Sequence, residues 1–188
     1  MRIQVGASAS RLPGWLNTDI ARGAEYYLDA TQPWPVPDGS VAYVYGDNFI
    51  EHLTLPEARA FLAHARRAMA PQGRIRLVTP DVGTTARLYL DGGLEQEAAL
   101  ARHRKHGYQV DYPVDLLRIL FAESEHWRGY CFDEVSLRSE LDAAGFVNVR
   151  RLHVGQSDDP VLRDLEDRTE PIEDRLQLVL EATAPDAS

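Results

Sequence analysis

The chain is poor in features that mark secreted and membrane proteins. Its single cysteine, Cys131, excludes an internal disulfide framework. No apolar run approaches the roughly 20 residues that a membrane-spanning helix needs, and no basic segment leads into an apolar one at the start, so we expect a cytoplasmic protein. Repeats, low-complexity tracts and long linkers are also missing. A length of 188 residues then predicts one domain over residues 1–188.

Positive charge is also scarce, with 20 Lys and Arg against 29 Asp and Glu and a formal net charge of −9. A nucleic-acid surface needs a basic face that this balance does not supply. The basic cluster at residues 102–106 is more simply a solvated helix face or the rim of a pocket for an acidic substrate. We expect neither nucleic acid nor a membrane as the partner, and leave a homodimer open.

Short apolar segments, rich in β-branched and aromatic residues, predict buried strands. They are residues 2–5, 15–19, 25–28, 41–45 and 75–79, followed by 147–154 and 176–182. Between them, residues 55–70 and 132–144 have apolar positions at helical spacing, with Thr54 and Asp133 as caps and Val135 among the inward positions. The alternation predicts an α/β fold with an open, doubly wound, Rossmann-like sheet and a ligand crevice at the strand carboxyl ends.

The remaining segments are assigned more loosely. Residues 157–175 are dense in charge and predict a solvated helix or lid. Residues 82–125 form an insertion after the strand at 75–79, on the side of the predicted ligand crevice where a substrate would bind. Its aromatic residues can line a substrate pocket or pack in the core. They are Tyr89, Tyr108, Tyr112 and Phe121.

The first nineteen residues contain the pattern that opens a nucleotide site. Gly6-Ala7-Ser8 follows the first strand, and it can turn tightly enough to bring backbone N–H groups close to a ligand. Asp19 ends the second strand, where its carboxylate can accept hydrogen bonds from both ribose hydroxyls. An ordinary strand, turn and strand is the alternative. A nicotinamide-dependent oxidoreductase is disfavoured because no Gly-x-Gly-x-x-Gly follows the first strand.

Four carboxylates follow strands that should end at one rim: Asp19, Asp29, Asp47 and Asp81. Like charges repel, and an unpaired buried ion loses several kcal/mol of solvation. A ligand rich in hydroxyls, amines or positive charge would relieve this conflict.

Six segments carry a family resemblance, in order along nearly the whole chain. They are Val5-Gly6-Ala7-Ser8, Leu12-Pro13-Gly14-Trp15-Leu16-Asn17-Thr18-Asp19, Pro33-Trp34-Pro35-Val36-Pro37-Asp38-Gly39-Ser40-Val41, Glu51-His52-Leu53, Ala70-Pro71-Gln72-Gly73-Arg74-Ile75-Arg76 and Ala143-Ala144-Gly145-Phe146. The series resembles class I S-adenosylmethionine-dependent methyltransferases, especially a short bacterial type. The resemblance implies a mostly parallel seven-stranded sheet with an antiparallel last strand, S-adenosylmethionine as cofactor, and methyl transfer to oxygen or nitrogen of a small-molecule or sugar-like acceptor.

The resemblance also implies which residues contact the cofactor. Gly6, Ala7 and Ser8 would lie against its methionine half, Asp19 and the adjacent Ile20 at the ribose, Asp29 and Ala30 at the adenine, and Asp47 near the amino group or sulfonium. The alternatives are a turn carboxylate at the strand end for Asp29 and, for Asp47, an N-cap of the turn leading into Glu51-His52. The family usually has glycine at the position of Ser8, whose Cβ tolerates a positive φ poorly.

Three side chains are candidates for catalysis: His52, His126 and Tyr130. Either histidine has the pKa range of a general base, although each can instead be structural. No metal site is expected, because His103 and His106, three residues apart, lack a third ligand. Together with Ser8, the lack of a clear base motivates a second hypothesis, a non-catalytic partner or regulatory protein with this fold and weak or no cofactor binding.

Overall fold

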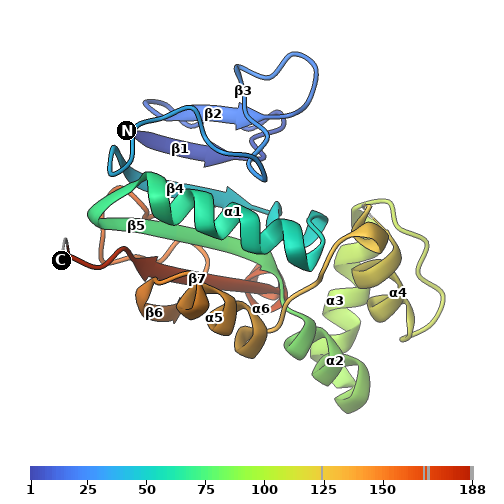
Figure 1. The fold of residues 1–188 in the computed structure, drawn as a ribbon. Coiled ribbons are helices and arrows are strands. Elements are labelled where there is room, and N and C mark those ends of the chain that lie inside the picture. The colour runs from blue at the N-terminus through green and yellow to red at the C-terminus, as the bar shows by residue number, and fades with distance from the viewer. Residues whose placement is uncertain (124, 167, 169, 187–188) are drawn as a thin grey trace.

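The computed structural model describes residues 1–123, 125–166, 168 and 170–186. Seven strands form one sheet in the order β3-β2-β1-β4-β5-β7-β6. They are β1 (Arg2–Val5), β2 (Leu16–Asp19), β3 (Tyr26–Tyr27), β4 (Val41–Asp47), β5 (Met69–Pro80), β6 (Val147–Leu152) and β7 (Gln177–Thr183). Neighbouring strands from β3 to β5 pair in parallel, whereas β7 is antiparallel to β5 and β6 (Figure 1). The predicted fold class is confirmed, including the antiparallel last strand.

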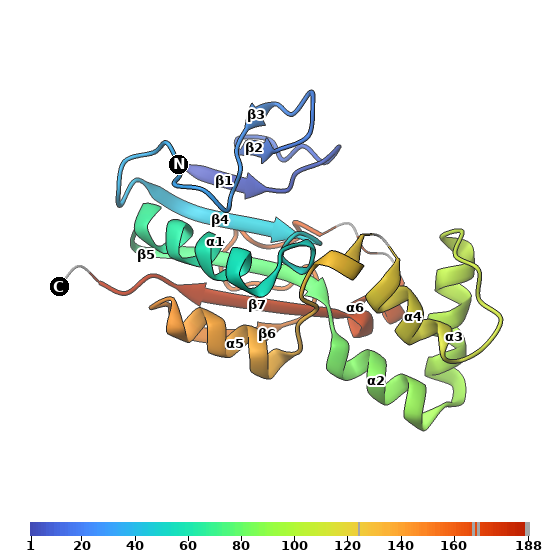
Figure 2. The same ribbon diagram turned by 45° about the vertical axis from the view of Figure 1, so that its right-hand side comes forward.

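The helices fall into two groups. The α-helices are α1 (Leu55–Ala68), α2 (Val82–Asp91), α3 (Gly93–Lys105), α4 (Asp115–Ala122), α5 (Glu134–Ala143) and α6 (Pro171–Leu176), and the 3₁₀ turns are η1 (Ile50–His52) and η2 (His126–Arg128). Helices α1 and α5 cover one face of the sheet, while α2, α3 and α4 gather beyond the carboxyl ends of the parallel strands (Figures 1 and 2). None of the described helices is long and apolar enough to cross a membrane.

The ends of α1 and α5 follow from local sequence. The carboxylate of Glu57 accepts hydrogen bonds from the N–H and the hydroxyl of Thr54, at 2.8 and 2.7 Å, which satisfies groups at the start of α1. The helix stops at Ala68, two residues before the predicted end, because β5 begins at Met69. In α5, the side chain of Asp133 accepts from the N–H of Ser136, as the capping prediction requires.

One inward position of α5 was predicted wrongly. The side chain of Val135 is 77% exposed, whereas Leu137 and Leu141 are fully buried. Residues four apart share a helix face, but Val135 precedes Leu137 by two positions, which places it on the opposite side. The sheet contact therefore follows Leu137 and Leu141.

The second face of the sheet is covered by residues 153–166, which form turns instead of a helix. Leu162 lies here in a buried cluster with Trp15, Tyr45, Val78 and Val179. The prediction of a solvated helix or lid over residues 157–175 is wrong for this part, because Leu162 and Glu166 are buried. Helix occurs only in α6, and residues 167 and 169 lie outside the described chain.

Arg76 connects this covering segment to the sheet. Its guanidinium donates to both carboxylate oxygens of Glu166, at 2.7 and 2.8 Å, and to Glu181 at 2.7 Å. It also donates to the carbonyl of Gln156, and the N–H of Gly155 donates to Glu166. The Arg76 and Glu166 side chains have no exposed surface, so each charge depends on its partner.

We expect Arg76→Leu to lower the free energy of unfolding by about 3–5 kcal/mol, because it leaves the buried carboxylate of Glu166 without its cation and removes one of the three arginines beside Glu181. The matched control is Arg59→Leu. Arg59 also makes two hydrogen bonds to one carboxylate, that of Glu140, but its side chain is 59% exposed, so the loss should stay within about 1 kcal/mol. Urea unfolding measures both variants, and equal losses would show that the buried network contributes no more than a surface pair.

Candidate functional site

A cleft of about 520 Å³ opens at the carboxyl ends of β1, β2 and β4. We call it the rim cleft. Its lining residues are Gly6, Ser8, Asp19, Ile20, Leu28, Asp29, Ala30, Thr31, Asn48, Phe49, His52, Leu53, Glu57, Glu125 and Arg128. Six of the eight predicted cofactor residues are thus brought together, all except Ala7 and Asp47.

The loop after β1 takes the shape that a close ligand approach needs. Gly6 has φ of +61°, and a Cβ there would lie 2.5 Å from the ring of Phe49, so the position requires glycine. Ser8 has φ of +48° and therefore occupies the left-handed region without glycine's freedom. Ala7 lies below the cleft: it is 1% exposed, and its N–H donates to the carbonyl of Thr18.

Asp19 and Asp29 both line the cleft while bonded to backbone. Asp19 accepts from the N–H of Ser8 and from that of Ala21, each at 2.8 Å, and so joins the β1 loop to the end of β2. Asp29 accepts from the N–H and hydroxyl of Thr31, at 3.0 and 2.6 Å, both on Oδ1. Asp29 is therefore both a turn carboxylate, as the alternative prediction has it, and a residue of the cleft wall.

Asp47 lies away from the rim cleft. Side chains alternate along a strand, so Asp47 shares a face with Tyr45, and it accepts from Arg168 at 2.7 Å and from the Tyr45 hydroxyl at 3.3 Å. Burial raises the pKa of Asp47, a change that Arg168 opposes. Asp81 is likewise paired, with Arg151 at 2.7 Å. Two of the four rim carboxylates are thus neutralised by the protein itself.

The charge that remains in the rim cleft is acidic. Four carboxylates line it, from Asp19, Asp29, Glu57 and Glu125, together with one guanidinium, from Arg128. Clustered charge of one sign in a cleft raises the local concentration of oppositely charged ligands. The cleft therefore favours a ligand of net positive charge.

A second, smaller cavity of about 180 Å³ lies between the sheet and the α2–α4 group. We call it the inner pocket. Its lining residues are Asn48, His52, Pro80, Thr85, Arg102, His103, Tyr108, Leu116, Ile119, Leu120, His126, Leu176 and Gln177. Asn48 and His52 line both cavities, so the rim cleft and the inner pocket meet at these two residues.

The α2–α4 group supplies one wall of the inner pocket. Among its predicted pocket aromatics, Tyr108 lines the pocket, whereas Tyr112 and Phe121 are exposed. Burial lowers the pKa of His103 to about 4, with smaller contributions from Arg102 and His106, so its imidazole is neutral at physiological pH. On this side of the pocket, Arg102 therefore carries a positive charge and His103 is polar but uncharged.

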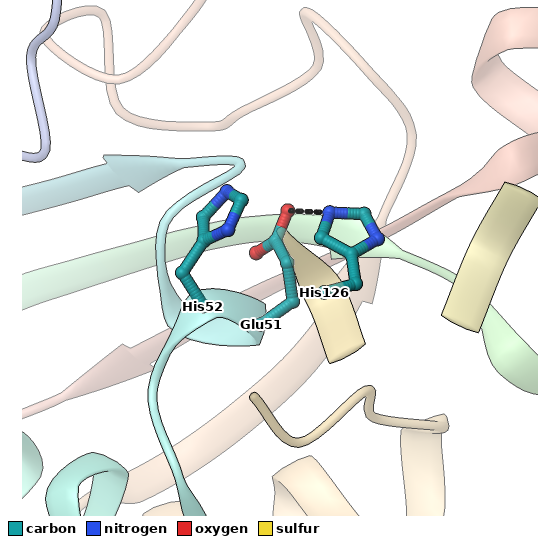
Figure 3. A group of neighbouring side chains, drawn as sticks. All are labelled: Glu51, His52 and His126. Atoms are coloured by element: carbon teal, nitrogen blue, oxygen red, sulfur yellow. Dashed lines mark ion pairs between the residues drawn. The ribbon is translucent and has the colours of Figure 1, made fainter. Parts of the chain in front are cut away.

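The candidate catalytic histidines meet where the two cavities join. The rings of His52 and His126 have centroids 5.0 Å apart, and the carboxylate of Glu51 lies beside both (Figure 3). Tyr130 does not join them: its ring packs against Phe132, with centroids 4.8 Å apart. Burial lowers the pKa of His52, and the neighbouring His126 adds to the effect.

Glu51 is a functional candidate that the sequence did not single out, although it lies in the Glu51-His52-Leu53 segment of the resemblance. Its side chain has no exposed surface, and Oε2 accepts from the hydroxyl of Thr79 at 3.0 Å. Burial raises its pKa to about 8, against the opposing effect of hydrogen bonds that include the one from Thr79. Its position beside His52 was the available signal, but only the 3₁₀ turn η1 directs it inward.

No family model and no curated protein sequence matches the chain. Solved structures do match. The CMeT domain of a citrinin polyketide synthase aligns with TM-score 0.58 and 14% identity over 98% of this chain and 46% of that one. The CurJ carbon methyltransferase aligns with TM-score 0.55 and 15% identity, over 98% of this chain and 48% of that one.

A third match is phosphoethanolamine N-methyltransferase 2 of Haemonchus contortus, in complex with S-adenosylmethionine, with TM-score 0.56 and 12% identity over 98% of this chain and 48% of that one. The chain spans about half the length of these three proteins. At such identities the likeness concerns the fold. The chain has the fold of class I S-adenosylmethionine-dependent methyltransferases.

Proposed function

We propose that the protein transfers a methyl group from S-adenosylmethionine to oxygen or nitrogen of a small-molecule or sugar-like acceptor. The observation that carries the proposal is an acidic cleft at the carboxyl ends of β1, β2 and β4 that meets a smaller polar pocket at Asn48 and His52. Cofactor and acceptor need such adjoining sites, because alignment of the reacting atoms supplies much of the rate.

The residues of the rim cleft fit the proposed cofactor. A volume of about 520 Å³ lies within the range of small-molecule sites. S-adenosylmethionine carries a sulfonium, an ammonium and one carboxylate, so its net positive charge suits a lining of four carboxylates and one guanidinium. A nicotinamide dinucleotide, with its anionic diphosphate, would be repelled by the same lining.

Individual roles follow the positions in the cleft. Gly6 and Ser8 would border the methionine half, Asp19 would hold the ribose hydroxyls, and Asp29 and Ala30 would border the adenine. Asp19 already accepts two backbone hydrogen bonds, and its carboxylate has further lone pairs for two hydroxyls. Asp47 has no part in this assignment, because Arg168 and Tyr45 hold it away from the cleft.

When bound, S-adenosylmethionine supplies an electrophilic methyl group. The chain would position the acceptor in the inner pocket and exclude water from it with the α2–α4 group. His52 and His126 would contact the acceptor, a role supported by their position: both line the inner pocket, and His52 also lines the rim cleft. The pocket volume of about 180 Å³ suits a small acceptor.

The second candidate function is a non-catalytic partner with weak or no cofactor binding. The observation that favours it is the φ of +48° at Ser8, in the loop that would approach the cofactor. The two hypotheses differ in whether the purified protein binds the cofactor at all.

Calorimetry should detect S-adenosylhomocysteine binding, and Asp19→Ala should weaken it by about 1–3 kcal/mol, roughly 5- to 150-fold, through loss of a charged acceptor. The affinity of Asp19→Asn should lie between those of the unsubstituted protein and Asp19→Ala, because the amide oxygen of asparagine retains one acceptor group. Asp38→Ala is the control, a carboxylate 72% exposed and outside the cleft. Equal affinity in all variants would remove Asp19 from the ribose site. No binding at millimolar ligand would favour the non-catalytic hypothesis, and binding of NAD instead would contradict both.

Ser8→Gly should raise the free energy of unfolding by about 0.5–1 kcal/mol, because glycine adopts the left-handed conformation without the cost paid by a Cβ. We also expect tighter S-adenosylhomocysteine binding. Ser10→Gly is the matched control in the same loop, and there the added freedom of the unfolded chain should lower stability. Weaker ligand binding in Ser8→Gly would instead indicate that the serine hydroxyl contacts the ligand.

A further inference from the structure

A carboxylate and two imidazoles converge where the rim cleft meets the inner pocket. Figure 3 shows Glu51 between His52 and His126, and one ligand atom from each lies within 4.8 Å of the others. Glu51 is fully buried, yet its Oε1 has no hydrogen-bond partner among the described residues. A buried carboxylate oxygen without a partner is costly, and a bound water or cation would supply the partner.

The hydrogen bonds around the group leave lone pairs facing one another. Nδ1 of His126 lies 2.8 Å from the carbonyl oxygen of Leu120. A carbonyl only accepts, so Nδ1 carries the ring proton, and a neutral His126 directs the lone pair of Nε2 toward Oε1 of Glu51, 4.0 Å away. Oε1 and Nε2 thus face each other across a gap too long for a hydrogen bond, and a metal cation placed between them, in place of any proton there, would bond to both.

Neighbouring groups hold the side chains of Glu51 and His126 in orientations that face this point. The hydroxyl of Thr79 donates to Oε2 of Glu51 and so directs Oε1 toward the histidines. Nδ1 of His126 is held by the carbonyl of Leu120, and the imidazole of His52 lies beside the backbone of Asn48. Metal-binding histidines and carboxylates are typically oriented by such partners on their other polar atoms.

We propose that Glu51, His52 and His126 bind a divalent transition-metal ion at the junction of the two cavities. Two imidazoles and one carboxylate form a donor set used by catalytic zinc and non-haem iron sites, whereas Mg²⁺ and Ca²⁺ prefer oxygen ligands. Ligand atoms around a tetrahedral zinc lie about 3.4 Å apart. The ligand atoms of the group lie up to 4.8 Å apart, with 4.0 Å between Glu51 and His126, so binding an ion would draw the side chains together by roughly 0.6 to 1.4 Å.

The fold creates this site from segments that the sequence keeps apart. The sequence pattern suggested only His103 and His106 as paired histidines, and His106 has a carboxylate neighbour, Glu173, at 3.9 Å. His126 instead comes from η2 and meets η1, which carries Glu51 and His52. No local spacing motif could have indicated the group.

Three protein ligands leave coordination positions open, and both histidines line the inner pocket. An oxygen of the methyl acceptor would complete the coordination and would be oriented and made more acidic by the ion. This consequence rests on the proposed function, whereas the binding of the ion does not.

The test uses the full chain after treatment with a chelator and buffer exchange. Calorimetry with Zn²⁺ and the visible absorption of added Co²⁺ should each give one ion per chain. Glu51→Gln and His126→Gln should weaken Zn²⁺ binding about 100-fold or more. His106→Gln, which removes a histidine near a carboxylate outside the group, should bind as the unsubstituted protein does, and millimolar Mg²⁺ should not displace Co²⁺.

Histidine resonances of the unsubstituted protein provide a readout that needs no variant: Zn²⁺ should shift those of His52 and His126. No stoichiometric binding, or full affinity in Glu51→Gln and His126→Gln, would overturn the proposal. Binding of S-adenosylhomocysteine, measured separately on metal-free protein, tests the proposed function. A protein that binds this ligand but no Zn²⁺ would retain the function and lose the metal site.

Discussion

The close approach of Gly129 to the backbone of Glu51 determines how the two cavities meet. A Cβ at residue 129 would lie 1.8 Å from the carbonyl oxygen of Glu51, so only glycine allows the chain to cross there. The next N–H, of Tyr130, donates to the carbonyl of Leu53 at 2.8 Å and fixes the crossing. Because η2 immediately precedes this contact, the crossing sets His126 beside Glu51 and closes the inner pocket on that side.

Two kinds of partner distinguish five of the described carboxylates. Asp47, Asp81 and Glu166 each contact an arginine of the protein, and their charge is balanced within the fold. Asp19 and Asp29 bond instead to backbone N–H and hydroxyl donors, which orient a carboxylate without cancelling its charge. The uncompensated charge is thereby concentrated in the rim cleft, where a positively charged ligand would balance it.

Features set by neighbouring residues were predictable from the sequence, and features set through space were not. The capping of α1, the end of β2 at Asp19 and the antiparallel β7 follow from local pattern or from the family resemblance. The partners of Asp47 and the burial of Glu166 depend on segments far along the chain, which periodicity does not report. Glu51 belongs to the Glu51-His52-Leu53 segment of the family resemblance, yet its inward orientation depends on the turn η1 and on the crossing at Gly129.

The position of β7 has a consequence for biosynthesis. This strand is the last of the seven in sequence order, yet it lies between β5 and β6 (Figure 1). The partners of Arg76 are also synthesised late, because Glu166 and Glu181 follow it by 90 and 105 residues. A nascent chain that has emerged only as far as β6 presents the open edge of β5 and an unneutralised arginine, a state prone to edge-to-edge association. The sheet is therefore complete only after β7 has been synthesised and has paired with both β5 and β6.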